Sequence, residues 1–156
     1  MPAESVTEFE LPGVFRLFAP LTWSRVDASQ HLLELRRHSP PGGTLSIQSA
    51  SVDQRSEASE QLLLETTEAM LNRWLPRMNR PDVGHIRTAT SSDGDVDCAL
   101  TLVTTADGDA LLLKLVLHVA SKLLYMFQYT GSRQVACDEV LRIFDSFEVV
   151  GATVGD

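Results

Sequence analysis

The run ALLLKLVLHVA, residues 110–120, decides the fold, because it is apolar in two directions at once. Successive side chains of an extended strand point to opposite faces of a sheet. Leu112 and Val116 would point one way, with Lys114 and His118 between them. Five residues would point the other way: Leu111, Leu113, Leu115, Leu117 and Val119. A sheet with one solvent-exposed face does not carry this pattern, so we expect apolar material to cover both faces.

Strand-like runs lie on both sides of this segment in the sequence. Four such runs follow one another: residues 83–90, 95–105, 110–120 and 122–130. We expect Val103, Leu124 and Met126 to share the face of Leu112 and Val116. Three further segments alternate apolar with polar side chains and predict strands nearer the N-terminus: residues 7–23, 31–38 and 44–52.

An acidic run, residues 91–97, begins like the D-x-D-x-D of a calcium-binding loop. The rest of that loop is missing, because Cys98 stands where it needs glycine and Thr104 where it needs glutamate. Asp93-Gly94 and Asp107-Gly108 are instead pairs that favour tight hairpin turns, since both residue types tolerate positive φ. The sequence therefore predicts two turns around a strand and no metal site.

Two segments have the spacing of helices. From Ser56, a plausible N-cap, apolar residues recur at helical intervals until Leu75, and Pro76 disfavours helical geometry at the residue before it. A second helix follows Gly131-Ser132, and its apolar face consists of Val135, Ala136, Val140, Ile143 and Phe144. The run SFEVV, residues 146–150, predicts a short closing strand.

These elements predict an α+β protein with an antiparallel sheet and two helices. Each helix needs a sheet face to cover, and the sheet has two apolar faces, so we expect an α/β/α sandwich. The alternative is that a partner chain covers the second face. The 156 residues suit one domain, with a core over residues 9–150 and a frayed tail at 151–156.

The composition narrows the range of partners and compartments. A formal net charge of −8 makes nucleic acid and anionic membranes poor partners. The longest apolar run is too short for membrane insertion, and the N-terminus lacks a signal-peptide pattern. Cys98 and Cys137 lack zinc-site spacing, and we expect free thiols in a reducing compartment. Arginine far outnumbers lysine, which is typical of a GC-rich bacterial genome. We expect a cytoplasmic bacterial protein.

Catalytic constellations are weak. His118 could act as a general base for Ser121 or Tyr125, but no nucleophile-elbow motif or activating aspartate accompanies it, which favours a polar residue near a strand end. Cys137 could be a thiolate in the first turns of the second helix, although a small core residue is the commoner role of free cysteine. We expect no enzyme, no cofactor and no metal.

Two binding roles remain open. A protein-binding adaptor would use apolar sheet or cleft surface, with Trp23, Leu112 and Val116 as contacts for a protein partner or a second copy of the chain. Core packing is the structural alternative for each of the three. A carrier of small apolar ligands would instead enclose a cavity between helix and sheet, ringed by Tyr125, Tyr129 and His118.

The order of elements and several short motifs resemble the Mog/PsbP-like superfamily over roughly residues 9–150. The resemblance rests on Phe18, Pro20 and Trp23 in FAPLTW, Asp27-Ala28-Ser29, Phe127 and Tyr129 in YMFQYTG, and Ile143, Ser146 and Phe147 in RIFDSFEV. That superfamily includes PsbP, DcrB and Ran-binding Mog proteins and the Eag-type chaperones of type VI secretion effectors. It is mostly non-enzymatic. Because no import or lipoprotein signal is present, the resemblance implies a chaperone-like role for a secreted effector.

Overall fold

The computed structural model describes residues 6–11, 15–26, 32–52, 59–90, 96–118 and 121–149. The predicted turn at Asp93-Gly94, the predicted N-cap Ser56, Val119 and the predicted tail at 151–156 lie outside these residues. The turn at Asp107-Gly108 is present between two paired strands, and Gly108 has a φ of 85°, as its glycine predicts.

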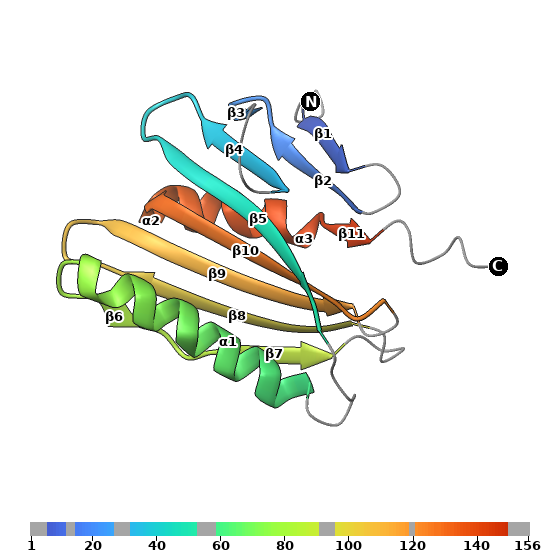
Figure 1. The fold of residues 1–156 in the computed structure, drawn as a ribbon. Coiled ribbons are helices and arrows are strands. Elements are labelled where there is room, and N and C mark those ends of the chain that lie inside the picture. Colours follow the sequence, from blue (N-terminus) through green and yellow to red (C-terminus); the bar gives the residue numbers. More distant parts are fainter. Residues whose placement is uncertain are drawn as a thin grey trace.

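Most strands form one eight-stranded sheet in which all neighbours are antiparallel (Figure 1). Its strands run in the spatial order β3 (Trp23–Arg25), β4 (Leu33–Arg37), β5 (Gly43–Ser51), β10 (Leu123–Ser132), β9 (Asp109–His118), β8 (Val96–Thr104) and β6 (Asp82–Val83), with β7 (Arg87–Thr90) also paired to β8. The strand that decided the sequence interpretation, β9, therefore lies well inside the sheet.

A second, three-stranded sheet joins distant parts of the chain. It has the order β1 (Val6–Leu11), β2 (Phe15–Pro20) and β11 (Glu148–Val149), which confirms the predicted closing strand. Phe15, Leu17 and Ala19 of β2 are buried and belong to the same core as the large sheet. This small sheet extends the layer that covers one face of the large sheet (Figure 1).

Both predicted helices are present. The first, α1, spans Ser59–Trp74 and continues into a 3-10 turn, η2 (Leu75–Arg77), that contains Pro76. The second helix, residues 133–145, consists of α2 (Arg133–Val135), a π-helical turn η3 (Ala136–Val140) and α3 (Leu141–Asp145). Its N-cap is Ser132, whose hydroxyl accepts a hydrogen bond from the amide of Gln134, as predicted.

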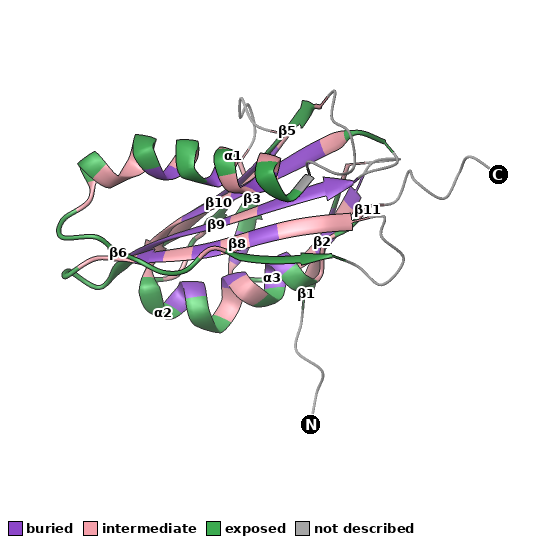
Figure 2. Cartoon of the chain, turned by 90° about the horizontal axis from the view of Figure 1, so that it is seen from below, coloured by how far each residue is buried: buried purple, intermediate pink, exposed green. Residues whose placement is uncertain are grey.

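Each helix covers a different face of the sheet, which confirms the predicted α/β/α layering (Figure 2). Under α1 lie Leu111, Leu113, Leu115 and Leu117. On the opposite face, the predicted apolar face of the second helix is buried together with Leu112, Val116, Tyr125, Phe127 and Tyr129. Side chains that alternate along β9 therefore belong to separate cores on the two faces of the sheet.

One detail of the predicted pattern is wrong. Val103 and Leu124 pair with Leu111 and Leu117, and Met126 pairs with Leu115. Directly paired residues share a face, so all three lie under α1 and not beside Leu112 and Val116. The sequence does not give the register between strands, and an offset of one residue exchanges the faces.

Neither helix covers its face completely. On the α1 side, the helix packs on β8 and β9 and leaves polar side chains of β4 and β5 open, among them Arg36 and Gln48. On the other side, the second helix packs on β9 and β10. Strand β8, which lies next to the edge formed by β6 and β7, therefore keeps a partly uncovered apolar row, and that row locates the candidate site.

Candidate functional site

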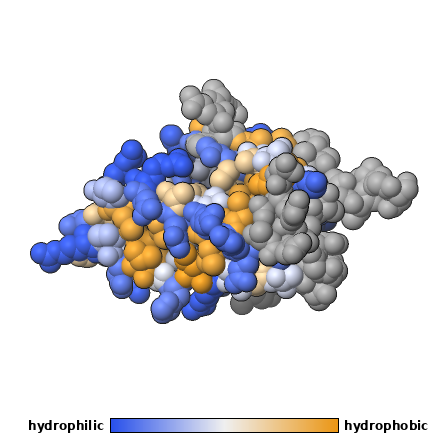
Figure 3. Space-filling view, turned by 60° about the horizontal axis from the view of Figure 1, so that its bottom comes forward, coloured by the Kyte–Doolittle hydropathy of each residue, from blue (hydrophilic) through white to orange (hydrophobic). Residues whose placement is uncertain are grey.

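A cleft of about 430 Å³ lies between the second helix and the sheet edge formed by β6 and β7, and we call it the β8 cleft. Its lining comes from both walls and from the strands beneath: Asp82, Gly84, His85, Arg87, Leu100, Thr101, Leu102, Thr104, Leu112, Arg133, Ala136, Cys137 and Leu141. Figure 3 brings the β6–β7 edge of the molecule forward and shows apolar surface between polar side chains. The volume lies in the range of small-ligand pockets.

The floor of the β8 cleft is apolar. Leu100 and Leu102 of β8 are half-buried, and Leu112 of β9 pairs directly with Leu102 and lies at the base. Leu141 of α3, also half-buried, contributes from the helix side. Alternation along β8 extends the same row beyond the cleft to Cys98 and Val96, which are also half-buried. The row persists because the second helix is too far towards β10 to cover it.

A break between β6 and β7 forms the outer wall. The amide of Gly84 donates to the carbonyl of Leu102 over 2.9 Å, and its carbonyl accepts from the hydroxyl of Thr101 over 3.2 Å. A β-carbon added at Gly84 would lie 2.9 Å from that Leu102 carbonyl oxygen. The close approach therefore requires glycine, and it fixes the chain that carries His85 and Arg87 at the rim.

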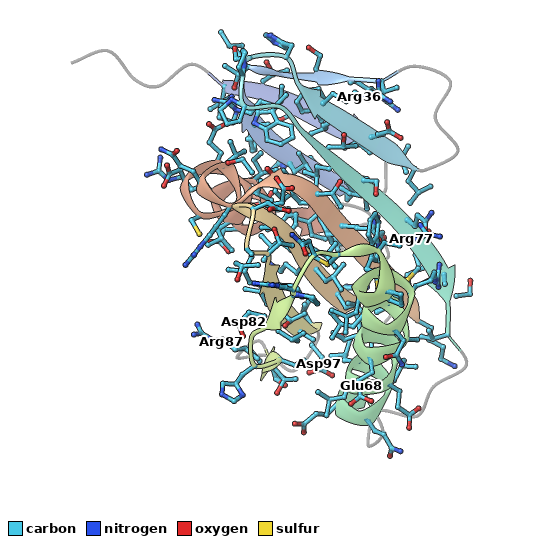
Figure 4. All side chains as sticks on the ribbon, turned by 90° about the vertical axis from the view of Figure 1, so that its left-hand side faces the viewer. Arg36, Glu68, Arg77, Asp82, Arg87 and Asp97 are labelled. Carbon is cyan, nitrogen blue, oxygen red and sulfur yellow. The ribbon has the colours of Figure 1, made fainter. Side chains whose placement is uncertain are left out.

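The rim of the cleft is charged. Arg87 projects from β7 on the cleft face because it pairs with Leu100, and Arg133 is the first residue of α2. Asp82 pairs with Thr104 and lines the same cleft. Figure 4 shows Asp82 and Arg87 at the sheet edge, on the side away from α1. Two guanidinium groups therefore face the cleft together with one carboxylate.

The helical wall is held in place by a partly buried ion pair. Glu139 of η3 accepts hydrogen bonds from Arg37 Nη2 and from Trp23 Nε1, each over 2.8 Å. Burial by itself raises the pKa of the Glu139 carboxyl, but hydrogen bonds from Arg37 and Trp23 and the charge of Arg37 bring this pKa below its ordinary value. The contact ties the second helix to β3 and β4.

The predicted contact residues are mostly structural. Trp23, Leu112 and Val116 are 2%, 2% and 4% exposed and belong to one core. Trp23 packs edge-on against Tyr129, and its indole nitrogen donates a hydrogen bond to Glu139. Of the three, only Leu112 also lines the β8 cleft. The cleft residues of β7 and α2 were not found from the sequence; the alternation of Val96, Cys98, Leu100 and Leu102 was the one available signal.

Tyr125, Tyr129 and His118, the predicted ring around a ligand cavity, do not line the β8 cleft. Tyr125 packs edge-on against Phe15 and Phe147. The hydroxyl of Tyr129 donates to the Ser132 carbonyl over 2.9 Å, and burial raises its pKa to about 12. These tyrosines lie in the aromatic core beneath the second helix, so a carrier would have to use other residues.

The structure places His118 and Cys137, the two side chains that the sequence offered as catalytic candidates. His118 is buried and its Nδ1 lies 2.6 Å from the Ser121 hydroxyl, across the turn between β9 and β10. The same nitrogen accepts a hydrogen bond from the Ser121 amide over 3.3 Å, a pattern typical of a side chain that stabilises a turn.

Cys137 is exposed and lines the β8 cleft, so its prediction as a core residue is wrong. Its neighbour Ala136 and Val140 supply the buried positions of this turn, and Cys137 lies outside that apolar face.

A second, smaller cavity of about 200 Å³, the α1 groove, lies on the opposite face. It is lined by Ser46, Gln48, Met70, Arg73, Trp74, Arg77, Met126 and Gln128. Trp74 Nε1 donates to Gln128 over 2.9 Å, and the Arg77 guanidinium lies 5.9 Å from the centre of the Trp74 ring. These contacts join three of the lining side chains to one another.

The described residues contain neither a helix long and apolar enough to cross a membrane nor a group of three or more side chains that could hold a metal ion.

Comparison with known proteins identifies the fold. No protein-family model matches the sequence, and no match emerges among curated proteins. Among solved structures, the Ran-binding protein Mog1p of Saccharomyces cerevisiae is similar with a TM-score of 0.62 at 9% identity, over 97% of this chain and 98% of that one. Cyanobacterial PsbP from Synechocystis sp. PCC 6803 is similar with a TM-score of 0.57 at 12% identity, over 96% and 95%.

The protein therefore has the α+β fold shared by Mog1p and PsbP, as the sequence motifs implied. Identity this low establishes the fold, and function has to be argued from the site.

Proposed function

We propose that the protein is a non-enzymatic, protein-binding adaptor that holds an apolar segment of a partner in the β8 cleft. The observation that carries this proposal is the half-buried row of Leu100 and Leu102, left uncovered between the second helix and β7. Uncovered apolar surface with a polar rim is typical of protein-binding sites. The similarity to Mog1p, which is a Ran-binding protein, supports a role with protein partners.

The proposal places the protein in the bacterial cytoplasm, as a chaperone-like module for a secreted effector, of the type VI kind that the superfamily resemblance suggests. Its apolar segment would stay shielded in the cleft before export. Co-expression tests this finer role: the N-terminal apolar segment of an effector should remain soluble with the wild-type chain. Equal solubility without the chain would remove the effector role.

The cleft itself is tested by Leu100→Asp, which puts a charge on its floor. Because a buried carboxylate opposes apolar contacts, we expect partner binding to fall by at least about tenfold. Asn72→Asp is the matched control, since it adds the same charge on the exposed surface of α1. Binding is measured by calorimetry with a partner identified by comparative pull-down. Equal binding by wild type and Leu100→Asp, with both folded, would contradict the proposal.

Further measurements would reveal either of two other occupants of the β8 cleft. A second copy of the chain in the cleft would give a dimer that Leu100→Asp dissociates in sedimentation velocity. A small apolar ligand, the carrier role, would appear as added mass in native mass spectrometry, also lost in Leu100→Asp. The non-enzymatic role would fail if Ser121→Ala abolished an esterase activity of the wild type.

A further inference from the structure

The β8 cleft contains two arginines without partners. Neither the side chain of Arg87 nor that of Arg133 makes an ion pair or hydrogen bond within the part of the chain that the structure describes. Three other arginines lie beside carboxylates, Arg16 with Glu148, Arg36 with Glu34 and Arg37 with Glu139, whereas Arg73 of the α1 groove also has no such partner among the described residues. The two cleft arginines are thus available to a ligand.

Their charge is opposite to that of the molecule as a whole. The chain has a formal net charge of −8, whereas the cleft is lined by two guanidinium groups against one carboxylate, Asp82. A local excess of positive charge attracts an anionic group to that point, whereas the acidic remainder of the surface repels anions. A ligand that carries this anionic group must also have apolar groups that contact the apolar floor of the cleft.

The two arginines approach the floor from different walls. Arg87 shares the face of Leu100, its direct partner in the sheet, and Arg133 begins the second helix opposite. The apolar row beneath them runs from Val96 to Leu102, which at about 3.3 Å per residue is about 20 Å long. That length matches an extended segment of about six residues, which is more than one small anion occupies.

We infer that the cleft selects a partner segment that combines apolar side chains with an acidic one, whose carboxylate is bound by Arg87 and Arg133. The inference rests on the proposed adaptor function and names the chemistry of its partner. Apolar side chains of the segment contact Leu100 and Leu102, which supply affinity through burial. Guanidinium–carboxylate hydrogen bonds set the position of the segment and exclude neutral or basic ones.

Selection from a library of random dodecapeptides displayed on phage tests this chemistry. The baits are the wild-type chain, the double variant Arg87→Gln/Arg133→Gln and Leu100→Asp. A matched control, Arg73→Gln/Arg77→Gln, removes two guanidinium groups from the α1 groove. Peptides selected by the wild type and by the control should combine leucine-like residues with aspartate or glutamate. The Arg87→Gln/Arg133→Gln bait should lose the acidic preference.

Affinity measurements complete the test. A selected peptide is compared with its twin in which asparagine replaces aspartate, by fluorescence anisotropy. We expect the twin to bind the wild type about tenfold more weakly, and to bind Arg87→Gln/Arg133→Gln equally well. Circular dichroism confirms that each variant is folded.

The possible failures are distinct. Selection of apolar but neutral peptides by the wild type would overturn the inference and leave the adaptor function standing. Failure to find any peptide whose binding depends on Leu100 would remove the adaptor function itself. An acidic preference that persists in Arg87→Gln/Arg133→Gln but disappears in Arg73→Gln/Arg77→Gln would move the site to the α1 groove and overturn the inference.

Discussion

At the scale of single residues, the aromatic core contains a polar group that packing alone holds in place. Tyr125 is 1% exposed, and its hydroxyl is buried without a hydrogen-bond partner in the described part of the chain. Burial accordingly raises the pKa of Tyr125. A buried hydroxyl without a partner costs about 1–3 kcal/mol relative to one in water. The ring is retained because it contacts Phe15 and Phe147 edge-on.

Tyr125→Phe should therefore leave the protein as stable as the wild type or stabilise it by up to about 1 kcal/mol, since it removes the hydroxyl and keeps the ring. Tyr129→Phe is the matched comparison, because that hydroxyl donates to the Ser132 carbonyl over 2.9 Å. We expect Tyr129→Phe to lose about 1 kcal/mol. Urea unfolding followed by circular dichroism measures both. A clear loss of stability in Tyr125→Phe would show that its hydroxyl has a partner.

At the scale of elements, two contacts hold the second helix and the long strands together. One is the carboxylate of Glu139 between Arg37 and Trp23, with 21% and 13% exposure for the Glu139 and Arg37 side chains. The other lies where β5 and β10 pair through Gly43 and Gly131, over which the Tyr129 ring is packed. Both contacts hold the second helix, which forms one wall of the β8 cleft, in its position.

Glu139→Gln should destabilise the protein at pH 7 by about 2–3 kcal/mol, since it removes the charge from hydrogen bonds to Arg37 and Trp23. The pKa of Glu139 is lowered on folding, so its charge stabilises the folded state above the ordinary value of 4.5. That contribution is lost as the pH falls below 4.5 and through the lowered pKa. The difference between variant and wild type should therefore shrink in acid. Urea titrations at a series of pH values measure it; a constant difference would contradict this account.

Gly131→Ala should destabilise the protein by more than Gly108→Ala. Gly131 has a φ of 151°, and an added β-carbon would lie 2.6 Å from the Tyr129 hydroxyl and 2.9 Å from the Gly43 α-carbon. Gly108 has a φ of 85° but open space around it, so alanine there costs only backbone strain of about 1–2 kcal/mol. Overpacking adds about 1–3 kcal/mol at Gly131. Thermal unfolding compares the two; equal losses would show that the ring moves aside freely.

At the scale of the whole molecule, the sequence predicted the layers better than the site. Alternation along β9 and two helical patterns were enough for an α/β/α sandwich, because periodicity reports directly which side chains need cover. Strand register was not predictable, so Val103, Leu124 and Met126 were assigned to the wrong face. The β8 cleft depends on how far the second helix reaches across the sheet, which is a matter of packing geometry. Arg87 and Arg133 are 46 residues apart in sequence and meet only through that geometry.

The small sheet has a consequence for how the chain reaches this state. Its central strand, β2, pairs with β1 nearby and with β11 across most of the chain, and Arg16 binds Glu148 at a separation of 132 residues. Closing such a distant pair costs loop entropy before any stabilisation is gained, which slows folding. During synthesis, Phe15 and Leu17 must wait for the aromatic residues near position 147 to leave the ribosome. Until then, the early strands expose apolar surface, which makes the incomplete chain prone to aggregation.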